Sequence, residues 1–208
     1  MTKLSEIRTG VIGVGSMGQN HARVYNEISH LIGTYDLDTT QNSKISSRLG
    51  VKAFKHLDEF FSEVDAITIA VPTIYHKEIA LMALERGVHV LVEKPLTNTI
   101  ADSVELVEAF DKSSIKLAVG HIERHNGVVK LTKEKLESGL WGDLISITAR
   151  RFSNYPNRIS DVGVILDLSI HDIDVLNYLI PSKLDSVYCI GSSSRGNNKE
   201  DNVNIVLN

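Results

Sequence analysis

Short runs of apolar, β-branched residues alternate along the chain with stretches in which apolar residues recur every three or four positions. The first pattern predicts buried strands, and the second predicts amphipathic helices. The apolar runs are nearly continuous, which is typical of parallel strands covered on both faces. The predicted strands lie at residues 9–14, 31–35, 51–54, 66–71, 88–92 and 116–119. The predicted helices lie at residues 17–28, 41–49, 57–62, 75–86 and 100–111.

The pattern changes after Gly120. The later elements are predicted as helices at residues 128–136 and 166–179 and strands at residues 144–152, 184–190 and 203–207. Strands that follow one another without a crossover helix are typical of an α+β domain. We therefore expect an α/β chain, with a doubly wound parallel sheet over residues 1–120 and a smaller α+β domain over residues 121–208.

The second domain is expected to be incomplete, because the sequence stops directly after an apolar strand. A sheet that stops there would expose an unpaired edge, which native proteins usually cover. We therefore expect a homo-oligomer that assembles through this C-terminal sheet.

A glycine-rich turn lies between the first predicted strand and the first predicted helix. Gly13, Gly15 and Gly18 occupy the spacing of a dinucleotide-binding fingerprint, with Ser16 and Met17 between the second and third glycines. Backbone N–H groups at such a helix start point at a pyrophosphate, and the glycines let the backbone approach it. The pattern of strand, glycine turn and helix predicts a Rossmann domain that binds a nicotinamide dinucleotide.

An acidic residue ends the second predicted strand. Asp36 follows the first glycine by 36 − 13 = 23 positions, where a carboxylate accepts hydrogen bonds from the adenosine ribose hydroxyls. Asp38 is the second candidate for this role. A carboxylate repels the extra phosphate of NADP, and no arginine stands at Leu37 or Asp38 to receive it. NAD is therefore the expected cofactor, ahead of NADP.

Composition narrows the possible partners and compartment. The 208 residues carry a formal net charge of −4, which gives no electrostatic reason to expect nucleic acid or an anionic membrane as a partner. The apolar runs are too short to span a bilayer, and the polar first residues are unlike a signal peptide. Cys189 is the single cysteine, which fits a reducing cytoplasm, and its apolar neighbours predict a buried side chain.

Three further segments carry a family resemblance: residues 71–76, residues 92–96 with a Glu-Lys-Pro element, and residues 166–174 with an Asp-x-x-x-His pattern. Together with the glycine fingerprint, they resemble the Gfo/Idh/MocA family of oxidoreductases. The resemblance runs from Arg8 to the end of the chain, and the combination of the last two motifs is specific. It implies a dehydrogenase that transfers a hydride between an alcohol and the cofactor.

The residues of these motifs suit that chemistry. Lys94 follows a parallel strand at its carboxyl end, where ligands of such sheets collect. Asp167 and His171 are four positions apart, so they share one face of a helix. Oxidation of a secondary hydroxyl needs a proton acceptor, and the resemblance implies that Lys94, Asp167 and His171 form the catalytic triad. We expect either Lys94 or His171 to take the proton, and Asp167 to orient either His171 or the substrate.

The resemblance also implies cofactor contacts after the fourth and fifth strands, with Pro72 and His76 beside the nicotinamide. The Lys94–Pro95 bond can be cis in this family. The implied cofactor contacts in these segments are Val71, Pro72, Thr73, His76, Glu93 and Lys94.

Substrate contacts are expected from the hinge after the sixth strand, where His121 faces the nicotinamide or caps the strand. His125 and Gly127 stand where family members often have an aromatic residue and a proline, so the substrate geometry departs from theirs. No metal site is expected, because no cysteine or carboxylate cluster joins the two histidines of this segment. The candidate substrate contacts are Lys94, His121, Arg124, Asn126, Arg158, Asp167 and His171.

Residues 158–167 look most like those of members that oxidise the 3-hydroxyl of nucleotide-linked amino sugars such as UDP-N-acetylglucosamine. Arg150, Arg151 and Arg158 then either hold the diphosphate or are surface charges. The rival substrate is a free sugar or inositol. A second class of function is a truncated NAD-binding protein without catalysis, because the chain is shorter than typical members.

Overall fold

The computed structural model describes residues 3–153, 162–180, 182–194 and 199–208. It divides the chain into two compact units, Met1–Gly120 and His121–Asn208. The first unit contains the sheet that the apolar runs predicted, and the second contains a separate pair of strands.

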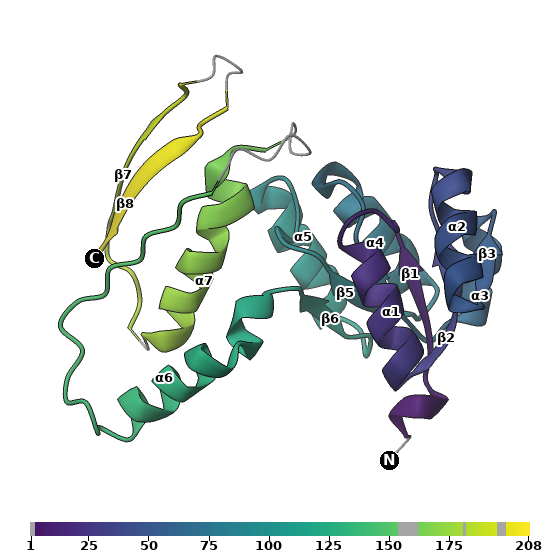
Figure 1. Ribbon diagram of the computed structural model, residues 1–208, viewed down its shortest axis with the longest axis horizontal. Helices are drawn as coiled ribbons and strands as arrows, with labels where there is room; N and C mark the ends of the chain where they lie inside the picture. Colours follow the sequence, from purple (N-terminus) through teal and green to yellow (C-terminus); the bar gives the residue numbers. More distant parts are fainter. Residues whose placement is uncertain (1–2, 154–161, 181, 195–198) are drawn as a thin grey trace. The chain divides into compact units, whose positions relative to one another are not determined.

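The first unit is a six-stranded sheet in which every pairing is parallel (Figure 1). The strand order is β3-β2-β1-β4-β5-β6, so the predicted doubly wound α/β sheet is confirmed. Most of the strands are shorter than the apolar runs that predicted them. Their bounds are β1 (Arg8–Ile12), β2 (His30–Tyr35), β3 (Lys52–Phe54), β4 (Ala66–Ile69), β5 (His89–Val92) and β6 (Leu117–Val119).

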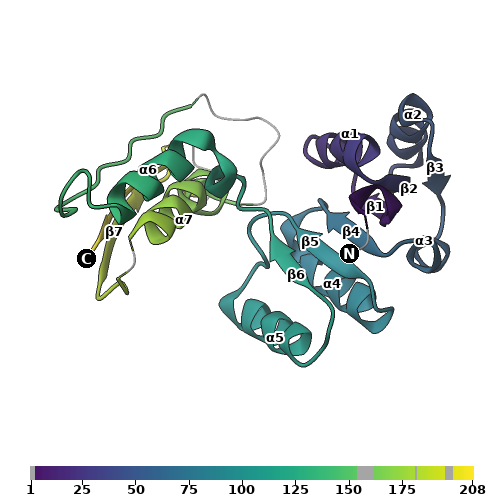
Figure 2. The same cartoon turned by 90° about the horizontal axis from the view of Figure 1, so that it is seen from below.

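Helices cover both faces of this sheet, as Figure 2 shows. The neighbours Val11 and Ile12 on β1 belong to different core clusters, because successive side chains of a strand point to opposite faces. One cluster includes residues of α1 and α2, and the other includes residues of α3, α4 and α5. The helices are α1 (Gly18–Ile28), α2 (Thr39–Leu49), α3 (Leu57–Glu63), α4 (His76–Glu85) and α5 (Ile100–Asp111).

The strand order reverses between β1 and β4, which lie side by side although about fifty residues separate them in sequence. In a doubly wound sheet, the crevice beyond the carboxyl ends of strands at this switch point is where ligands bind. The segments that leave β1, β4 and β5 at that edge are the glycine-rich turn, residues 70–75 and the Glu-Lys-Pro element.

The second unit begins with a short 3-10 helix, η3 (Ile122–His125), and continues with α6 (Gly127–Glu137). A π-helical turn, η4 (Ile165–Ser169), leads directly into α7 (Ile170–Leu179). Two antiparallel strands follow, β7 (Val187–Ser192) and β8 (Asn202–Leu207).

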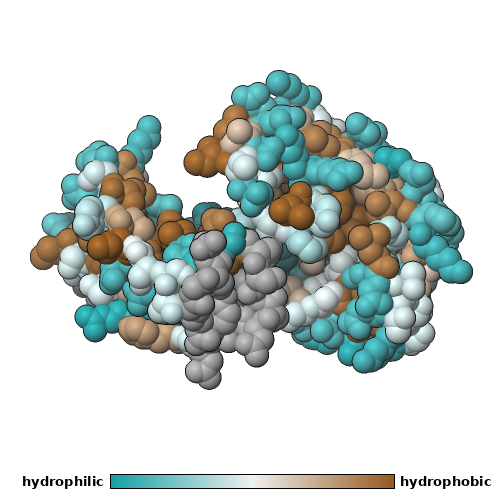
Figure 3. Space-filling view, turned by 90° about the horizontal axis from the view of Figure 1, so that it is seen from above, coloured by the Kyte–Doolittle hydropathy of each residue, from teal (hydrophilic) through white to brown (hydrophobic). Residues whose placement is uncertain are grey.

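Two expectations for this unit are wrong. Residues 144–152 form no strand, because their alternating pattern finds no hydrogen-bonded neighbour among the described residues, and a strand is stable only beside one. Cys189 is exposed rather than buried, since all six residues of β7 are exposed. Apolar side chains such as Val187 and Ile190 therefore lie at the surface, and the space-filling view shows exposed apolar residues in this unit (Figure 3).

Among the described residues, no helix has both the length and the apolar character needed to cross a membrane.

The aromatic cluster under β1 gives a test of the core. Phe60 is fully buried and meets Phe54 and Phe61 edge to face, with ring centroids 5.2 and 5.8 Å away. Phe60→Ala should lower the free energy of unfolding by about 3–5 kcal/mol, because it removes a large buried side chain and leaves a cavity. Urea denaturation measures the change, and Ile100→Ala, at an 85% exposed position, is the control expected to stay within about 0.5 kcal/mol.

Candidate functional site

The glycine-rich turn leaves β1 and enters α1 with its backbone tightly folded. Gly13 has a φ of +84°, which side chains disfavour, and its N–H donates to the Tyr35 carbonyl at 2.8 Å. A Cβ on Gly18 would lie 1.7 Å from the Gly13 carbonyl oxygen, so strand and helix meet at a distance that glycine alone permits.

The middle of this turn is open. Among the described residues, a Cβ on Gly15 would meet no heavy atom within 4 Å, and Ser16 and Met17 are also exposed. The turn therefore leaves open space beside its backbone at the start of a helix, and we call residues 13–18 the cradle. That geometry and its backbone donors fit the pyrophosphate of a dinucleotide.

Asp36 lies directly after β2, and its carboxylate is hydrogen-bonded to the start of the glycine-rich turn. One carboxylate oxygen accepts the Val14 N–H at 2.7 Å, and the other accepts the Asp38 N–H at 2.8 Å. A carboxylate has about four lone-pair positions, so two acceptor positions remain for a ligand hydroxyl. Asp38 instead caps α2, accepting the N–H groups of Thr40 and Gln41 at 3.0 Å each.

The segment after β4 contains Val71, Pro72 and Thr73, followed by His76 at the start of α4. The His76 side chain is only 1% exposed, and its ring nitrogens lie 2.9 Å from the carbonyl oxygens of Val71 and Pro95. Both ring nitrogens therefore face backbone carbonyl groups, and almost none of the residue is exposed. That His76 borders a nicotinamide stays a prediction; in the structure its side chain holds two backbone segments together.

The Glu-Lys-Pro element after β5 is held by a second histidine. One oxygen of Glu93 lies 2.6 Å from Nε2 of His21 on α1, and the other accepts the Lys94 N–H at 3.2 Å. The Lys94–Pro95 bond is cis, as the family resemblance allowed. Sequence reasoning missed His21, although its place three residues after Gly18, in the first turn of the helix, was a usable signal.

The ionisation of Glu93 reflects this environment. Burial raises the pKa of its carboxyl, but the hydrogen bond and charge of His21, together with the Lys94 N–H and the Lys94 charge, outweigh burial. The net shift of the Glu93 pKa is downward, so the ionised form is favoured in the folded chain.

Asp167 and His171 belong to the second unit, whereas Lys94 belongs to the first. Asp167 lies in the π-helical turn and His171 in the first turn of α7. π-Turns of this kind are frequent at functional sites. The start of this turn is fixed by Glu200, whose backbone carbonyl accepts the Val164 N–H at 2.9 Å and whose carboxylate accepts the Ile165 N–H at 3.2 Å.

The hinge residues have structural partners. Arg124 makes a two-pronged ion pair with Asp174, with nitrogen–oxygen distances of 2.6 and 2.9 Å, and Asp174 is only 7% exposed. Nδ1 of His121 lies 3.5 Å from the same carboxylate. Asn126 caps α6 by accepting the Val128 N–H at 3.0 Å. Arg124 and Asn126 thus have partners within this unit, and their roles as substrate contacts stay predictions. Asp174 is a buried ion-pair partner.

The arginines expected at a diphosphate differ in their surroundings. Arg151 is paired with Asp172 at 2.8 and 3.0 Å, which favours the interpretation that it is a surface charge. Arg158 lies outside the described residues. The described residues contain no cluster of three or more His, Cys, Asp or Glu side chains placed to hold a metal ion.

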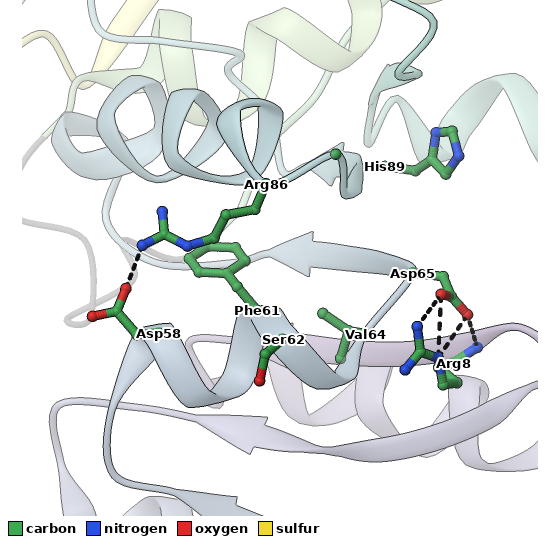
Figure 4. Close-up of a pocket in the computed structure, with 9 residues that line it drawn as sticks. Arg8, Asp58, Phe61, Ser62, Val64, Asp65, Arg86 and His89 are labelled. Atoms are coloured by element: carbon green, nitrogen blue, oxygen red, sulfur yellow. Dashed lines mark hydrogen bonds and ion pairs between the residues drawn. The ribbon is translucent and has the colours of Figure 1, made fainter.

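A polar pocket opens at the amino ends of β4 and β5, away from the glycine-rich turn (Figure 4). Arg8 and Asp65 form a 2.5 Å ion pair there, and Arg86 pairs with Asp58 while lying over the Phe61 ring. The hydrogen bond from Arg8 lowers the pKa of Asp65. Because both arginines are neutralised by aspartates, this pocket has no excess charge with which to attract an ionic ligand.

Comparisons with known proteins agree with this geometry. A family model described as an oxidoreductase family with an NAD-binding Rossmann fold matches residues 7–121, and the GFO/IDH/MocA C-terminal domain matches residues 129–208. The chain belongs to the Gfo/Idh/MocA oxidoreductase family. This result bears out the resemblance inferred from the glycine, Glu-Lys-Pro and Asp-x-x-x-His motifs.

The chain is similar to the UDP-N-acetylglucosamine 3-dehydrogenase of Acidithiobacillus ferrooxidans, with 34% identity over 89% of this chain. It is also similar to the myo-inositol 2-dehydrogenase of Thermotoga maritima, with 31% identity over 89% of this chain. A solved structure of the Acidithiobacillus protein superposes with a TM-score of 0.89, covering 97% of this chain and 65% of that chain. The chain spans 58% of the length of both curated relatives.

Two glycine substitutions test the cradle. Gly18→Ala should destabilise the first unit by about 2 kcal/mol or more, because its Cβ would clash with the Gly13 carbonyl. Gly15→Ala should leave the free energy of unfolding within about 0.5 kcal/mol, since the position is open. Thermal unfolding compares them, and equal losses of stability would refute this account of the turn.

The lowered pKa of Glu93 predicts a pH dependence. A depressed folded-state pKa means that ionised Glu93 stabilises the fold above its unfolded value of about 4.3 and loses this contribution as the pH falls through the folded value. The stability gap between wild type and Glu93→Gln should therefore be constant above about pH 5 and narrow below about pH 4. Urea unfolding across this range measures the gap, with the exposed Glu108→Gln as control.

Proposed function

We propose that this chain binds NAD and takes part in the oxidation of a secondary hydroxyl of a sugar or nucleotide sugar. The observation that carries the proposal is the open backbone cradle at Gly15, on the same helix start that contacts the Glu-Lys-Pro element through His21 and Glu93. Family membership supports the same chemistry, because the Acidithiobacillus and Thermotoga relatives are named dehydrogenases.

The cradle residues and Asp36 would hold the dinucleotide. Backbone groups of residues 13–18 would face the pyrophosphate, and the acceptor positions of Asp36 would take the ribose hydroxyls. The Asp36 carboxylate would repel a 2′-phosphate, and Leu37 and Asp38 supply no cation to balance it. These features support NAD over NADP.

When bound, the nicotinamide supplies an acceptor for the hydride. The chain's own residues would manage the proton: Lys94 from the first unit and His171 from the second are the candidate acceptors, and Asp167 would orient a partner. A lysine ammonium also stabilises a developing alkoxide. The support for these roles is the match of the Glu-Lys-Pro and Asp-x-x-x-His motifs to the family.

The proposed substrate is UDP-N-acetylglucosamine or a similar nucleotide sugar, oxidised at its 3-hydroxyl. Its support is the similarity to the Acidithiobacillus UDP-N-acetylglucosamine 3-dehydrogenase. The second candidate is an inositol, favoured by the similarity to the Thermotoga myo-inositol 2-dehydrogenase. The third candidate is NAD binding without turnover, which the 58% coverage of these relatives motivates. The exposed apolar residues of β7 support assembly of copies through this sheet.

Adding NAD to the purified chain, with UDP-N-acetylglucosamine or with myo-inositol, tests the proposal. Growth of reduced-nicotinamide absorbance with one substrate is expected, and Lys94→Met should lower kcat by about a hundredfold or more. Lys112→Met, at a 78% exposed side chain on the same unit, is the matched control and should keep full activity.

Binding of NADH without turnover would identify a non-catalytic binding protein. A chain that binds neither NAD nor NADH would refute the proposed function entirely. Fluorescence of NADH on titration with the protein separates these two results.

A further inference from the structure

A pair of partly buried titratable side chains links the phosphate-binding helix to the Glu-Lys-Pro element. His21 and Glu93 are 72 positions apart in sequence, yet Nε2 and Oε1 lie 2.6 Å apart. Their side chains are only 21% and 13% exposed, so water competes weakly with the contact. Such a short contact between a carboxylate and a ring nitrogen is a strong hydrogen bond when the nitrogen donates.

Glu93 is confined on its remaining sides. Its N–H donates to the Ile69 carbonyl of β4 at 2.9 Å, and a Cβ on Gly120 would lie 3.4 Å from its Cα and carboxyl carbon. Its second carboxylate oxygen accepts the Lys94 N–H. One carboxylate thus contacts both the His21 ring and the backbone N–H of Lys94, so the position of His21 affects the backbone of Lys94.

The other side of Lys94 is fixed as well. Nδ1 of His76 lies 2.9 and 3.3 Å from the carbonyl oxygens of Pro95 and Leu96. The residues on either side of Lys94 are therefore each held by a histidine: Glu93 by His21 of α1, and Pro95 by His76 of α4. His21 is the anchor that belongs to the helix at the glycine-rich cradle.

We infer that His21 is a positioning residue: through Glu93 it sets the backbone of Lys94 relative to the phosphate-binding helix. The inference rests on the proposed function, in which the cradle holds the pyrophosphate and Lys94 acts at the nicotinamide end. Loss of the His21–Glu93 contact should therefore disturb the nicotinamide end of the site and spare the pyrophosphate end.

Two ligands separate these ends. NADH engages both, whereas ADP carries the adenosine and the pyrophosphate without the nicotinamide riboside. In His21→Leu, calorimetry should show NADH binding weakened about tenfold and ADP binding changed less than twofold, because a partly buried charge-assisted hydrogen bond is lost. His21→Gln, whose side-chain amide can donate to Glu93, should recover NADH binding to within about threefold of wild type.

The contact itself is tested with Glu93→Gln, which keeps the shape of the side chain and removes its charge. Glu93→Gln should show a selective loss of NADH affinity in the same direction, and adding it to His21→Leu should cause no further loss, because both changes act on one charge-assisted interaction. Arg23→Leu removes an exposed 2.8 Å pair with Glu27 on the same helix and is the control expected to change neither ligand.

An equal loss of NADH and ADP affinity in His21→Leu would overturn the inference, since it would mean that His21 only supports the helix. Unchanged affinity for both ligands would overturn it too. If His21→Leu does not fold, the ratio of the two affinities in Glu93→Gln decides the matter in the same way. A wild-type chain that fails to bind NADH overturns the proposed function, and this inference with it.

Discussion

The backbone contact between the end of β1 and the start of α1 is the constraint on which the first unit depends. A Cβ on Gly18 would lie 1.7 Å from the Gly13 carbonyl oxygen, so strand and helix meet without a side chain between them. This close approach puts the first turn of α1 over the carboxyl edge of the sheet. The contacts of Asp36 with the turn and of His21 with Glu93 both require the helix to start there.

Two polar side chains near this edge make hydrogen bonds to the backbone. His76 joins the segments after β4 and β5, and Asp36 accepts two backbone N–H groups. In the second unit, Asn126 caps a helix and Arg124 is paired with a buried aspartate. Segments that end parallel strands leave backbone groups without sheet partners, and nearby polar side chains satisfy them.

In the second unit, the Asp-x-x-x-His motif begins in a π-helical turn rather than after a strand. Asp167 lies in a π-helical turn that Glu200 anchors from the segment before β8, so two distant parts of this unit meet at the start of α7. The strand pair that follows is exposed at every position of β7. This unit matches the C-terminal domain of the Gfo/Idh/MocA family, and the chain spans 58% of the length of its Acidithiobacillus relative.

The sequence by itself determined the six strands and their crossover helices, because strands buried on both faces are continuously apolar and helices are periodic. It also determined the glycine cradle and the Glu-Lys-Pro element, since these depend on residues close together in the chain. The tertiary structure alone decided that His21 meets Glu93, His76 meets Pro95 and Arg124 meets Asp174. The members of these pairs lie 19 to 72 positions apart. The tertiary structure also leaves residues 144–152 without a neighbouring strand among the described residues. Such contacts depend on which elements become neighbours, and local patterns of polarity do not encode that.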